Sequence, residues 1–571
     1  DGLPEGRTDA LGGTVHYTYD AARRLIRLTN ENGEAYRFAY DQRDRLVLET
    51  AFDGKTTAYR YNAAGELEER HEYGISADTF PNVPEQKAER ISRYEHDVQG
   101  NLIRTTVQRS ADGQSQSKAY GYDGNGRLIR AAAENHITQT DYTPAGQLLG
   151  QYTRFIDQEA DRQKGLPPTR WDDPGQDALH LDDTRNLLYL YDANGNQSSL
   201  HLPDGSRLNQ LYYGTGHLHH IGLTIPHSGA SNDIERLTIS DIERDRQHRE
   251  IQRSQGQLTS RYTLDPAGRL LDQAAYGGNG TSPVQRHYRY DKSGQLTQSQ
   301  DRHNGQTRYR YDPLGRLLEA RNTPEDTAET YTYDAAGNPL PEDSPAGRIW
   351  PGNRIDEYKG IRYHYDTHGN LIGSEDSTKH IRRELEYDVF DRLVKATVWK
   401  QTPDGTWHKE EWHYEYDALD RRMAKWRTEG DGQADRTEYL WDGSRLLQET
   451  RGNKTHTYIY SDQGSYEPLA QITADADNGR EREILYYHCD QIGVPRVLTD
   501  AAGHTVWRGR YGAWGGLEEE EKAEGIHQPL RLQNQYCDEE TGLHYNFFRY
   551  YKPDAGRFVN QDPIGLWGGE N

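Results

Sequence analysis

The chain has 571 residues, of which 33% are apolar, and its formal charge is −23. This acidity repels phosphate backbones and argues against nucleic acid as a partner, and no apolar run reaches the roughly 18 residues that span a membrane. The 41 tyrosines, against eight phenylalanines and one methionine, are unusual for stacked compact domains. We therefore expect amphipathic rings buried in thin layers.

One short unit, Tyr-x-Tyr-Asp-x-x-Gly-Arg-Leu, recurs along the chain. Its first three copies contain Tyr19-Asp20, Tyr40-Asp41 and Tyr61-Asn62, which are 21 residues apart. Such regular spacing of tyrosine argues against a disordered chain. Further copies contain Tyr122-Asp123, Tyr191-Asp192, Asp265-Pro266, Tyr290-Asp291, Tyr311-Asp312, Tyr333-Asp334, Tyr365-Asp366, Tyr387-Asp388 and Tyr416-Asp417.

Each part of the unit predicts a local structure. Tyrosines at i and i+2 place two rings on one face of a strand. The aspartate accepts hydrogen bonds from backbone amides that follow it, and the glycine accepts a positive φ, so Asp-x-x-Gly predicts a turn. Each copy therefore predicts a β-hairpin, and consecutive copies predict a meander. Roughly fifty strands would exceed the ten or so of an open twisted sheet, so the sheet must coil, close or stack.

Three segments, 73–90, 153–184 and 221–250, interrupt the period. These interruptions disfavour a stack of separate β-domains or propeller blades, which would need regularly paired units. The charged stretch 241–250 fits either a strand pair or a short helix. We predict an all-β chain in which residues 1–485 form a continuous, spiralling, single-layer antiparallel sheet.

The Tyr-Asp units resemble the YD repeats of the Rhs family, which includes toxin-complex C subunits and, more distantly, teneurins. The resemblance is most specific near the C-terminus. It covers Pro529-Leu-Arg531, Tyr536-Cys-Asp538-Glu-Glu-Thr-Gly542, Gly556-Arg557-Phe558 and Asp562-Pro563-Ile564-Gly565-Leu566. It implies a hollow β-cocoon that is closed by a C-terminal plug and encloses a toxin. It also implies that residues 486–571 include an aspartyl autoprotease.

The resemblance places the cleaved bond between Leu566 and Trp567, next to the motif residues Pro563 and Gly565. It assigns Asp538 and Asp562 as the catalytic acidic pair. Two carboxylates that share one proton can activate water and protonate the leaving amine. A tethered substrate makes one turnover sufficient.

Two arginines, Arg531 and Arg557, are candidates to orient a carboxylate or hold the carbonyl at the cut. Lys552 departs from the family pattern, because an aspartate often precedes the proline of this turn. The departure weakens a scheme with three carboxylates and leaves the pair intact, and Asp554 is a less suitable substitute.

Other candidate sites carry weaker signals. Cys489 and Cys537 are too few for a disulfide framework or a four-thiolate metal site, and we expect free thiols. The histidines at 217, 219 and 220 fit a strand face better than a metal site. We expect neither a metal nor a cofactor.

The resemblance implies a cage that delivers its own C-terminal toxin, which would follow Asn571, since a chain that starts at Asp1 is expected to be a fragment. It implies export from the cytoplasm by a bacterial secretion system, type VI above all. The implied partners are the enclosed toxin, a secretion spike protein, a chaperone and an immunity protein that binds the toxin.

Two other functions remain open from the sequence. One alternative is a cell-surface adhesion or carbohydrate-binding protein that uses tyrosine and tryptophan as platforms, but such a protein has no need of Asp-Pro-x-Gly-Leu. A hydrolase of external substrates would need a singular pocket, which a repeat does not offer.

Overall fold

The computed structural model describes residues 2–75, 80–156, 162, 184–226, 234–277, 280, 282–323, 326–340, 349–350, 354–430, 432–475 and 482–561. These residues form 49 strands, and every pairing between strands is with a chain neighbour in antiparallel orientation. No helix within the described ranges is long and apolar enough to cross a membrane. The predicted meander of hairpins is confirmed.

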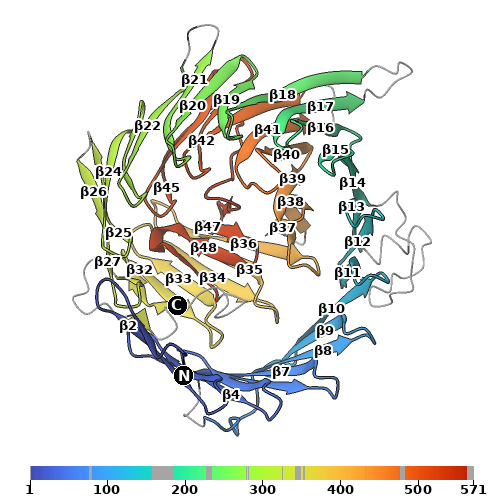
Figure 1. Ribbon diagram of the computed structural model, residues 1–571, viewed down its shortest axis with the longest axis vertical. Coiled ribbons are helices and arrows are strands. Elements are labelled where there is room, and N and C mark those ends of the chain that lie inside the picture. The colour runs from blue at the N-terminus through green and yellow to red at the C-terminus, as the bar shows by residue number, and fades with distance from the viewer. Residues whose placement is uncertain are drawn as a thin grey trace.

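The first 26 strands form one sheet, here called the wide coil, which runs around the outside of the molecule (Figure 1). Its strands are β1 (Gly6–Thr8), β2 (Thr14–Tyr19), β3 (Leu25–Thr29), β4 (Ala35–Tyr40), β5 (Leu46–Thr50), β6 (Lys55–Tyr61), β7 (Leu67–Ile75), β8 (Arg90–His96), β9 (Leu102–Arg109), β10 (Ser115–Tyr122), β11 (Leu128–Ala133), β12 (His136–Tyr142), β13 (Leu148–Phe155), β14 (Arg185–Tyr191), β15 (Gln197–His201), β16 (Arg207–Tyr212), β17 (Leu218–Pro226), β18 (Ile234–Arg244), β19 (Glu250–Gln255), β20 (Leu258–Leu264), β21 (Leu270–Gly277), β22 (Val284–Tyr290), β23 (Leu296–Asp301), β24 (Gly305–Tyr311), β25 (Leu317–Thr323) and β26 (Thr327–Thr330). The charged stretch 241–250 is a strand pair, since β18 pairs with β19.

A second sheet of 15 strands, here called the narrow coil, follows a smaller circle (Figure 1). Its strands are β31 (Glu357–Tyr358), β32 (Ile361–Tyr365), β33 (Leu371–Asp376), β34 (Ile381–Tyr387), β35 (Leu393–Gln401), β36 (Trp407–Tyr416), β37 (Arg422–Glu429), β38 (Gly432–Asp442), β39 (Arg445–Arg451), β40 (Lys454–Tyr460), β41 (Pro468–Asp475), β42 (Arg482–Cys489), β43 (Pro495–Thr499), β44 (Thr505–Tyr511) and β45 (Leu517–Lys522). Along the chain, two short strand pairs separate the wide coil from the narrow coil. They are β27 (Thr332–Tyr333) with β28 (Pro339–Leu340), and β29 (Ile349–Trp350) with β30 (Arg354–Ile355).

A separate four-stranded sheet, here called the plug sheet, ends the described chain inside the ring of strands (Figure 1). It contains β46 (Tyr536–Asp538), β47 (Leu543–Asn546), β48 (Arg549–Lys552) and β49 (Arg557–Phe558), with a 3₁₀ turn at Pro553–Ala555. The predicted boundary at residue 486 falls inside β42, which is an ordinary strand of the narrow coil. The change of sheet therefore lies between Lys522 and Tyr536.

The turn at Asp123 shows how each repeat folds. Its carboxylate accepts hydrogen bonds from the backbone amides of Asn125 and Arg127, each at 2.9 Å, and from the Arg127 side chain at 2.6 Å. Gly126 has a φ of 76°, a backbone conformation that favours glycine. The predicted roles of aspartate and glycine in the turn are confirmed.

The arginine and tyrosine of the unit link neighbouring repeats. Arg127 donates to the carbonyl of Thr143 in the next turn, and its guanidinium lies 4.9 Å from the ring centroid of Tyr142. The Tyr142 hydroxyl donates back to the carbonyl of Leu128 at 3.0 Å. Each repeat is thus tied to the next one by the residues that define it.

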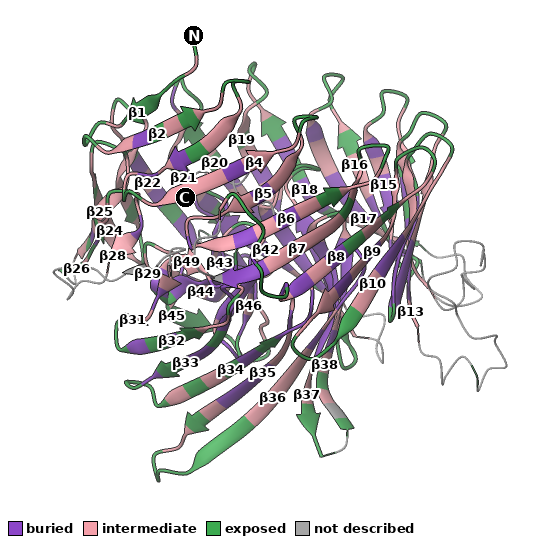
Figure 2. Ribbon diagram, turned by 90° about the horizontal axis from the view of Figure 1, so that it is seen from below, coloured by how far each residue is buried: buried purple, intermediate pink, exposed green. Residues whose placement is uncertain are grey.

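The two coils stack along their whole length, and the narrow coil covers the same arc with fewer residues. Asn32 hydrogen-bonds to Asp334, Lys118 pairs with Asp420, Gln255 donates to Leu469, and Ala513 donates to Glu329. Residues 118 to 329 of the wide coil thus lie beside residues 420 to 513 of the narrow coil, while Asn32 contacts the turn of the short β27–β28 pair. The two coils together are here called the wall. The wall tapers from the wide coil to the narrow coil, and Figure 2 shows the coils one above the other.

Part of the wall has two layers, which corrects the prediction of a single-layer sheet. Aliphatic side chains of the wide coil, such as Leu187 and Ile221, form one buried cluster with Leu440, Ile459 and Leu469 of the narrow coil. This cluster is mainly aliphatic. The cluster shared by the narrow coil and the plug sheet combines aliphatic side chains with many buried tyrosines, among them Tyr414, Tyr439, Tyr458, Tyr487, Tyr536 and Tyr545.

Candidate active site

The turn between β46 and β47 positions Asp538, the first predicted catalytic residue. Its backbone carbonyl accepts hydrogen bonds from the amides of Thr541 and Gly542, and Gly542 has a φ of 69°. The turn is therefore closed through the backbone of Asp538. The carboxylate is left to point away from its own turn, unlike the carboxylates of the repeat turns.

Two cations from strand β37 hold the Asp538 carboxylate. Arg422 Nη1 lies 2.6 Å from Oδ2, and Lys425 Nζ lies 3.0 Å from Oδ1. The side chain of Asp538 is completely buried. Burial raises the pKa of this carboxyl, but Arg422 and Lys425 outweigh burial and hold the pKa below its usual value. The plug sheet thus carries a buried carboxylate ion.

A second carboxylate balances the charge of the site. Lys425 Nζ also lies 3.0 Å from Glu540, whose other oxygen accepts a hydrogen bond from the Tyr414 hydroxyl at 2.9 Å. The site therefore contains two cations and two carboxylates. Paired ions are the arrangement in which buried charges are tolerated.

Tyrosine rings surround the Arg422 guanidinium. The centroids of four rings lie within 4.4 to 5.6 Å of it, a distance at which cation–π attraction operates. These rings belong to Tyr414, Tyr439, Tyr536 and Tyr545. Two of them come from the narrow coil and two from the plug sheet, so one arginine joins both parts.

A further buried carboxylate, Glu449 of β39, fixes the entry to the plug sheet. It accepts hydrogen bonds from the hydroxyls of Tyr458 at 2.5 Å and Tyr536 at 2.7 Å, and its other contact is His527 at 2.5 Å. Burial raises the pKa of Glu449, but His527 above all holds it well below its usual range. Residues 527 and 536 are thereby anchored to the narrow coil, at the two ends of the segment that leads into the plug sheet, here called the connecting segment.

The two predicted arginines lie elsewhere. Arg531 donates to the carbonyls of Gln528 and Leu530, at 2.8 and 3.0 Å, and so shapes the connecting segment. Arg557 donates to the carbonyl of Pro339 at 3.4 Å. The structure pairs Asp538 with Arg422 and Lys425, which sequence reasoning missed.

The predicted residues Asp562, Pro563, Gly565, Leu566 and Trp567 lie outside the described residues. The residues just before them are held by hydrogen bonds to other parts of the molecule. Leu371 donates to the carbonyl of Val559 at 2.9 Å, Tyr550 donates to the side chain of Asn560 at 2.9 Å, and Gln561 donates to Asp53 at 3.2 Å.

The remaining sequence candidates have other partners. Lys552 pairs with Asp554 at 2.8 Å, which engages the carboxylate considered as a substitute. Cys489 and Cys537 are free thiols, as predicted, with Cys489 buried and Cys537 partly exposed. His220 contacts Asp241 at 2.6 Å, and no cluster of three or more His, Cys, Asp or Glu that could hold a metal occurs among the residues with described positions.

The repeat itself contained one signal for Arg422. In the copy Tyr416-Asp417-Ala-Leu-Asp-Arg421-Arg422, an arginine stands where other copies have leucine, such as Leu128 and Leu393. Lys425 follows three residues later. A charged residue at an inward-facing leucine position indicates a buried partner.

Comparison with known proteins covers nearly the whole chain. Residues 232–567 match the family model described as the teneurin YD-shell, and residues 1–35 and 24–56 match the RHS repeat. The chain is 34% identical to double-stranded DNA deaminase toxin A of Burkholderia cenocepacia, over 99% of this chain and 38% of that protein. It is 33% identical to toxin protein Tse5 of Pseudomonas aeruginosa, over 63% of this chain and 31% of that protein.

More distant matches agree in fold. The chain is 27% identical to the probable deoxyribonuclease RhsA of Dickeya dadantii, over 100% of this chain and 36% of that protein. The solved Photorhabdus luminescens Tc holotoxin pore shares its fold, with a TM-score of 0.73 and 17% identity over 98% of this chain and 29% of that one. The chain thus spans about a third of the length of the curated relatives that it matches.

Proposed function

The chain belongs to the YD-shell family of Rhs proteins, and we propose on this basis that it is the cage of a bacterial toxin and cuts its own chain between Leu566 and Trp567. The toxin would follow residue 571 and stay enclosed after the cut. The observation that carries the proposal is the buried plug sheet, whose Asp538 is held as an ion inside the wall by Arg422 and Lys425.

The chemistry would use two carboxylates with different protonation states. Because its pKa is lowered, Asp538 suits the ionised member, which takes a proton from the attacking water. Asp562 would be the protonated member, which polarises the carbonyl and gives its proton to the leaving amine. Two adjacent carboxylates cannot both ionise freely, so the cations beside Asp538 would decide which of them carries the charge.

The anchored approach to the cut supports an intramolecular reaction. Val559, Asn560 and Gln561 are each hydrogen-bonded to fixed parts of the molecule just before Asp562. A tethered and oriented substrate can have an effective molarity of about 10⁵ M or more, so a modest pair of carboxylates is enough for one turnover.

The relatives favour a cage over an adhesion protein, since the matched proteins are named as toxins and nucleases. We propose that this chain encloses its own toxin and is exported by a bacterial secretion system. A spike protein, a chaperone and an immunity protein for the toxin are the partners that this function requires.

The test is self-cleavage of the complete natural chain. The wild type should give two fragments on a denaturing gel, and intact mass should place the cut after Leu566. Asp538→Asn and Asp562→Asn should each abolish the cut, while Asp123→Asn, which alters an exposed repeat turn, should leave it complete. An uncut wild type, or cutting that persists in Asp562→Asn, would refute the protease.

A further inference from the structure

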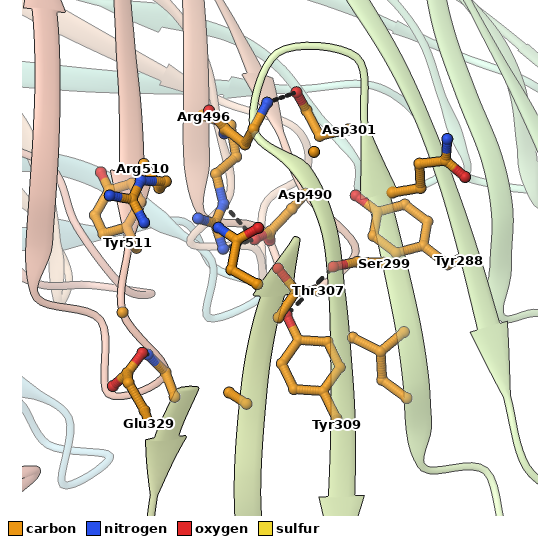
Figure 3. A pocket seen from close by; sticks show the side chains of 18 of the residues that line it. Tyr288, Ser299, Asp301, Thr307, Tyr309, Glu329, Asp490, Arg496, Arg510 and Tyr511 are labelled. Carbon is orange, nitrogen blue, oxygen red and sulfur yellow. Dashed lines mark hydrogen bonds and ion pairs between the residues drawn. The ribbon is translucent and has the colours of Figure 1, made fainter. Parts of the chain in front are cut away.

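A cavity of about 450 Å³ lies between the ends of the two coils. One side is formed by β22 to β26, including Tyr288 and Tyr309, and the other by the narrow coil, including Arg496 and Tyr511 (Figure 3). The volume is within the range of ligand sites. We call it the seam cavity, because it lies on the seam between the coils.

Six of the seven charged side chains that line the seam cavity form ion pairs with one another, and the seventh, Glu329, accepts hydrogen bonds from the Tyr331 hydroxyl and the Ala513 amide. Their shortest ion pairs measure 2.8 to 3.1 Å. The pairs are Arg286 with Asp301, Arg496 with Asp490, and Arg510 with Glu518. A charged ligand would have to displace these partners, so the lining favours an uncharged one.

Several buried polar atoms in the lining have no hydrogen-bond partner among the described residues. They are the Tyr288 hydroxyl, Arg286 Nη2, the Tyr511 hydroxyl and Asn322 Oδ1. Tyr288 is 2% exposed and Arg286 is 4% exposed. Leaving such a buried group unpaired is unfavourable, so an occupant that offers both donors and acceptors would be favoured.

Both large sheets end at this cavity. Within the described ranges, β26 pairs only with β25 and β45 pairs only with β44, so each has one open edge. Thr327, Ala328 and Glu329 of β26 line the cavity, as does Glu518 of β45. An open edge presents unpaired backbone N–H and C=O groups, which an added strand satisfies.

We infer that the seam cavity holds an extended, uncharged stretch of the enclosed polypeptide, added as a strand beside β26. Peptide amides supply donors and acceptors at the spacing of an open edge, and they carry no charge that would disturb the three ion pairs. The inference rests on the proposed cage function and deepens it, because the wall would then have one preferred binding place for the enclosed polypeptide. Binding would depend on backbone hydrogen bonds rather than on particular side chains.

Photocrosslinking in the complete natural chain tests the inference. A benzophenone amino acid replaces Tyr288 in one variant and Tyr309 in a second, so that the result does not depend on one buried position. Arg289, one residue along β22 and exposed on the opposite face, is the first control. Tyr17, at the same place in the repeat on β2, is the second control and reports on a part of the wall that does not line the cavity.

We expect the downstream polypeptide to be crosslinked from positions 288 and 309, weakly from 17, and not from 289, with the linked peptides identified by mass spectrometry. Crosslinks from 17 without any from 288 or 309 would overturn the inference while leaving the cage function intact. Equal yields from 17, 288 and 309 would overturn it too, since the wall would then have no preferred place. No crosslink to the downstream chain from any inward position would contradict enclosure itself.

Discussion

Two aspartates that each begin a turn ending at a glycine have opposite surroundings. Asp123, in the wall, is half-buried and uses its carboxylate to close its own turn through the amides of Asn125 and Arg127. Asp538, in the plug sheet, closes its turn through its backbone carbonyl and directs its carboxylate to Arg422 and Lys425 of the wall.

The difference distinguishes contacts that every repeat makes from a contact that only one repeat makes. Carboxylates of the repeat turns bond within their own turn, so one copy of the unit can follow another without changes in its neighbours. The carboxylate of Asp538 acts over more than a hundred residues of chain and depends on one particular copy of the repeat. Sequence similarity of the two turns therefore conceals two roles, one in folding each hairpin and one in docking the plug sheet.

The largest expected effect is that of Asp538→Ala. It leaves Arg422 without its carboxylate in a buried site, and breaking a buried ion pair in this way costs about 3–5 kcal/mol. Hydrogen exchange should show residues 536–558 losing protection before the wall does. Asp123→Ala should produce only a local change at its turn, and equal effects of the two variants would erase the distinction between them.

Removing both partners should cost less than the sum of the single losses. Arg422→Leu restores the residue that most copies of the repeat contain, but it deprives Asp538 of its closest cation. In a double-mutant cycle of Arg422→Leu with Asp538→Asn, measured by urea unfolding, we expect a coupling of about 1–3 kcal/mol. A cycle that is additive within error would mean that the two residues do not interact energetically.

Acid should weaken the plug sheet through His544. Burial first, and Arg531 second, lower the pKa of this buried histidine to about 3, whereas the unfolded chain has a value of about 6.5. The unfolded state then binds the extra proton, so the free energy of unfolding falls as the pH drops below about 6.5, by about 1.4 kcal/mol per pH unit.

The measurement is the unfolding free energy between pH 7 and 5 for the wild type and His544→Asn. The variant should show a shallower pH dependence by up to one proton. A wild-type slope in His544→Asn would show that this histidine is not kept neutral by burial.

The smallest effects should come from single tyrosine hydroxyls. The Tyr61 hydroxyl makes one wall bond, to the carbonyl of Leu46 at 2.7 Å. The Tyr416 hydroxyl bonds both to the carbonyl of Leu393 at 2.8 Å and to Tyr550 of the plug sheet at 2.6 Å.

Tyr61→Phe should lower the unfolding free energy by about 0.5–1.5 kcal/mol, and Tyr416→Phe by about twice as much, because two hydrogen bonds are lost rather than one. Thermal unfolding of both variants checks the ranking. If Tyr61→Phe lowered the unfolding free energy more than Tyr416→Phe, the hydroxyl bond within the wall would be the more stabilising of the two, contrary to this expectation.

Local features of the fold followed from the sequence, whereas contacts between distant segments did not. The hairpin at Asp123 and Gly126 is encoded within a few residues, so the turn and the meander were predictable. The face-to-face packing of Leu187 and Leu440 depends on how far the sheet coils, which no local pattern specifies. The boundary at 486 was drawn from a family resemblance, but β42 continues the wall because its strand pattern is unchanged.

The candidate site shows the same division. Asp538 could be identified because its turn resembles a family motif. Arg422 and Lys425 are brought to it only when β37 of the narrow coil passes beside the plug sheet, and a leucine position occupied by arginine was the sole local sign of this. Arg531 is close to Asp538 in sequence, yet its side chain donates to the backbone carbonyls of Gln528 and Leu530.

Limited proteolysis of the complete natural chain tests the central claim most directly. The claim is that the wall, closed by the plug sheet, encloses the polypeptide that follows residue 571. Under native conditions that downstream segment should resist trypsin for as long as the wall does, and it should become sensitive in Asp538→Ala. Rapid digestion of the downstream segment while the wall stays intact would contradict the account.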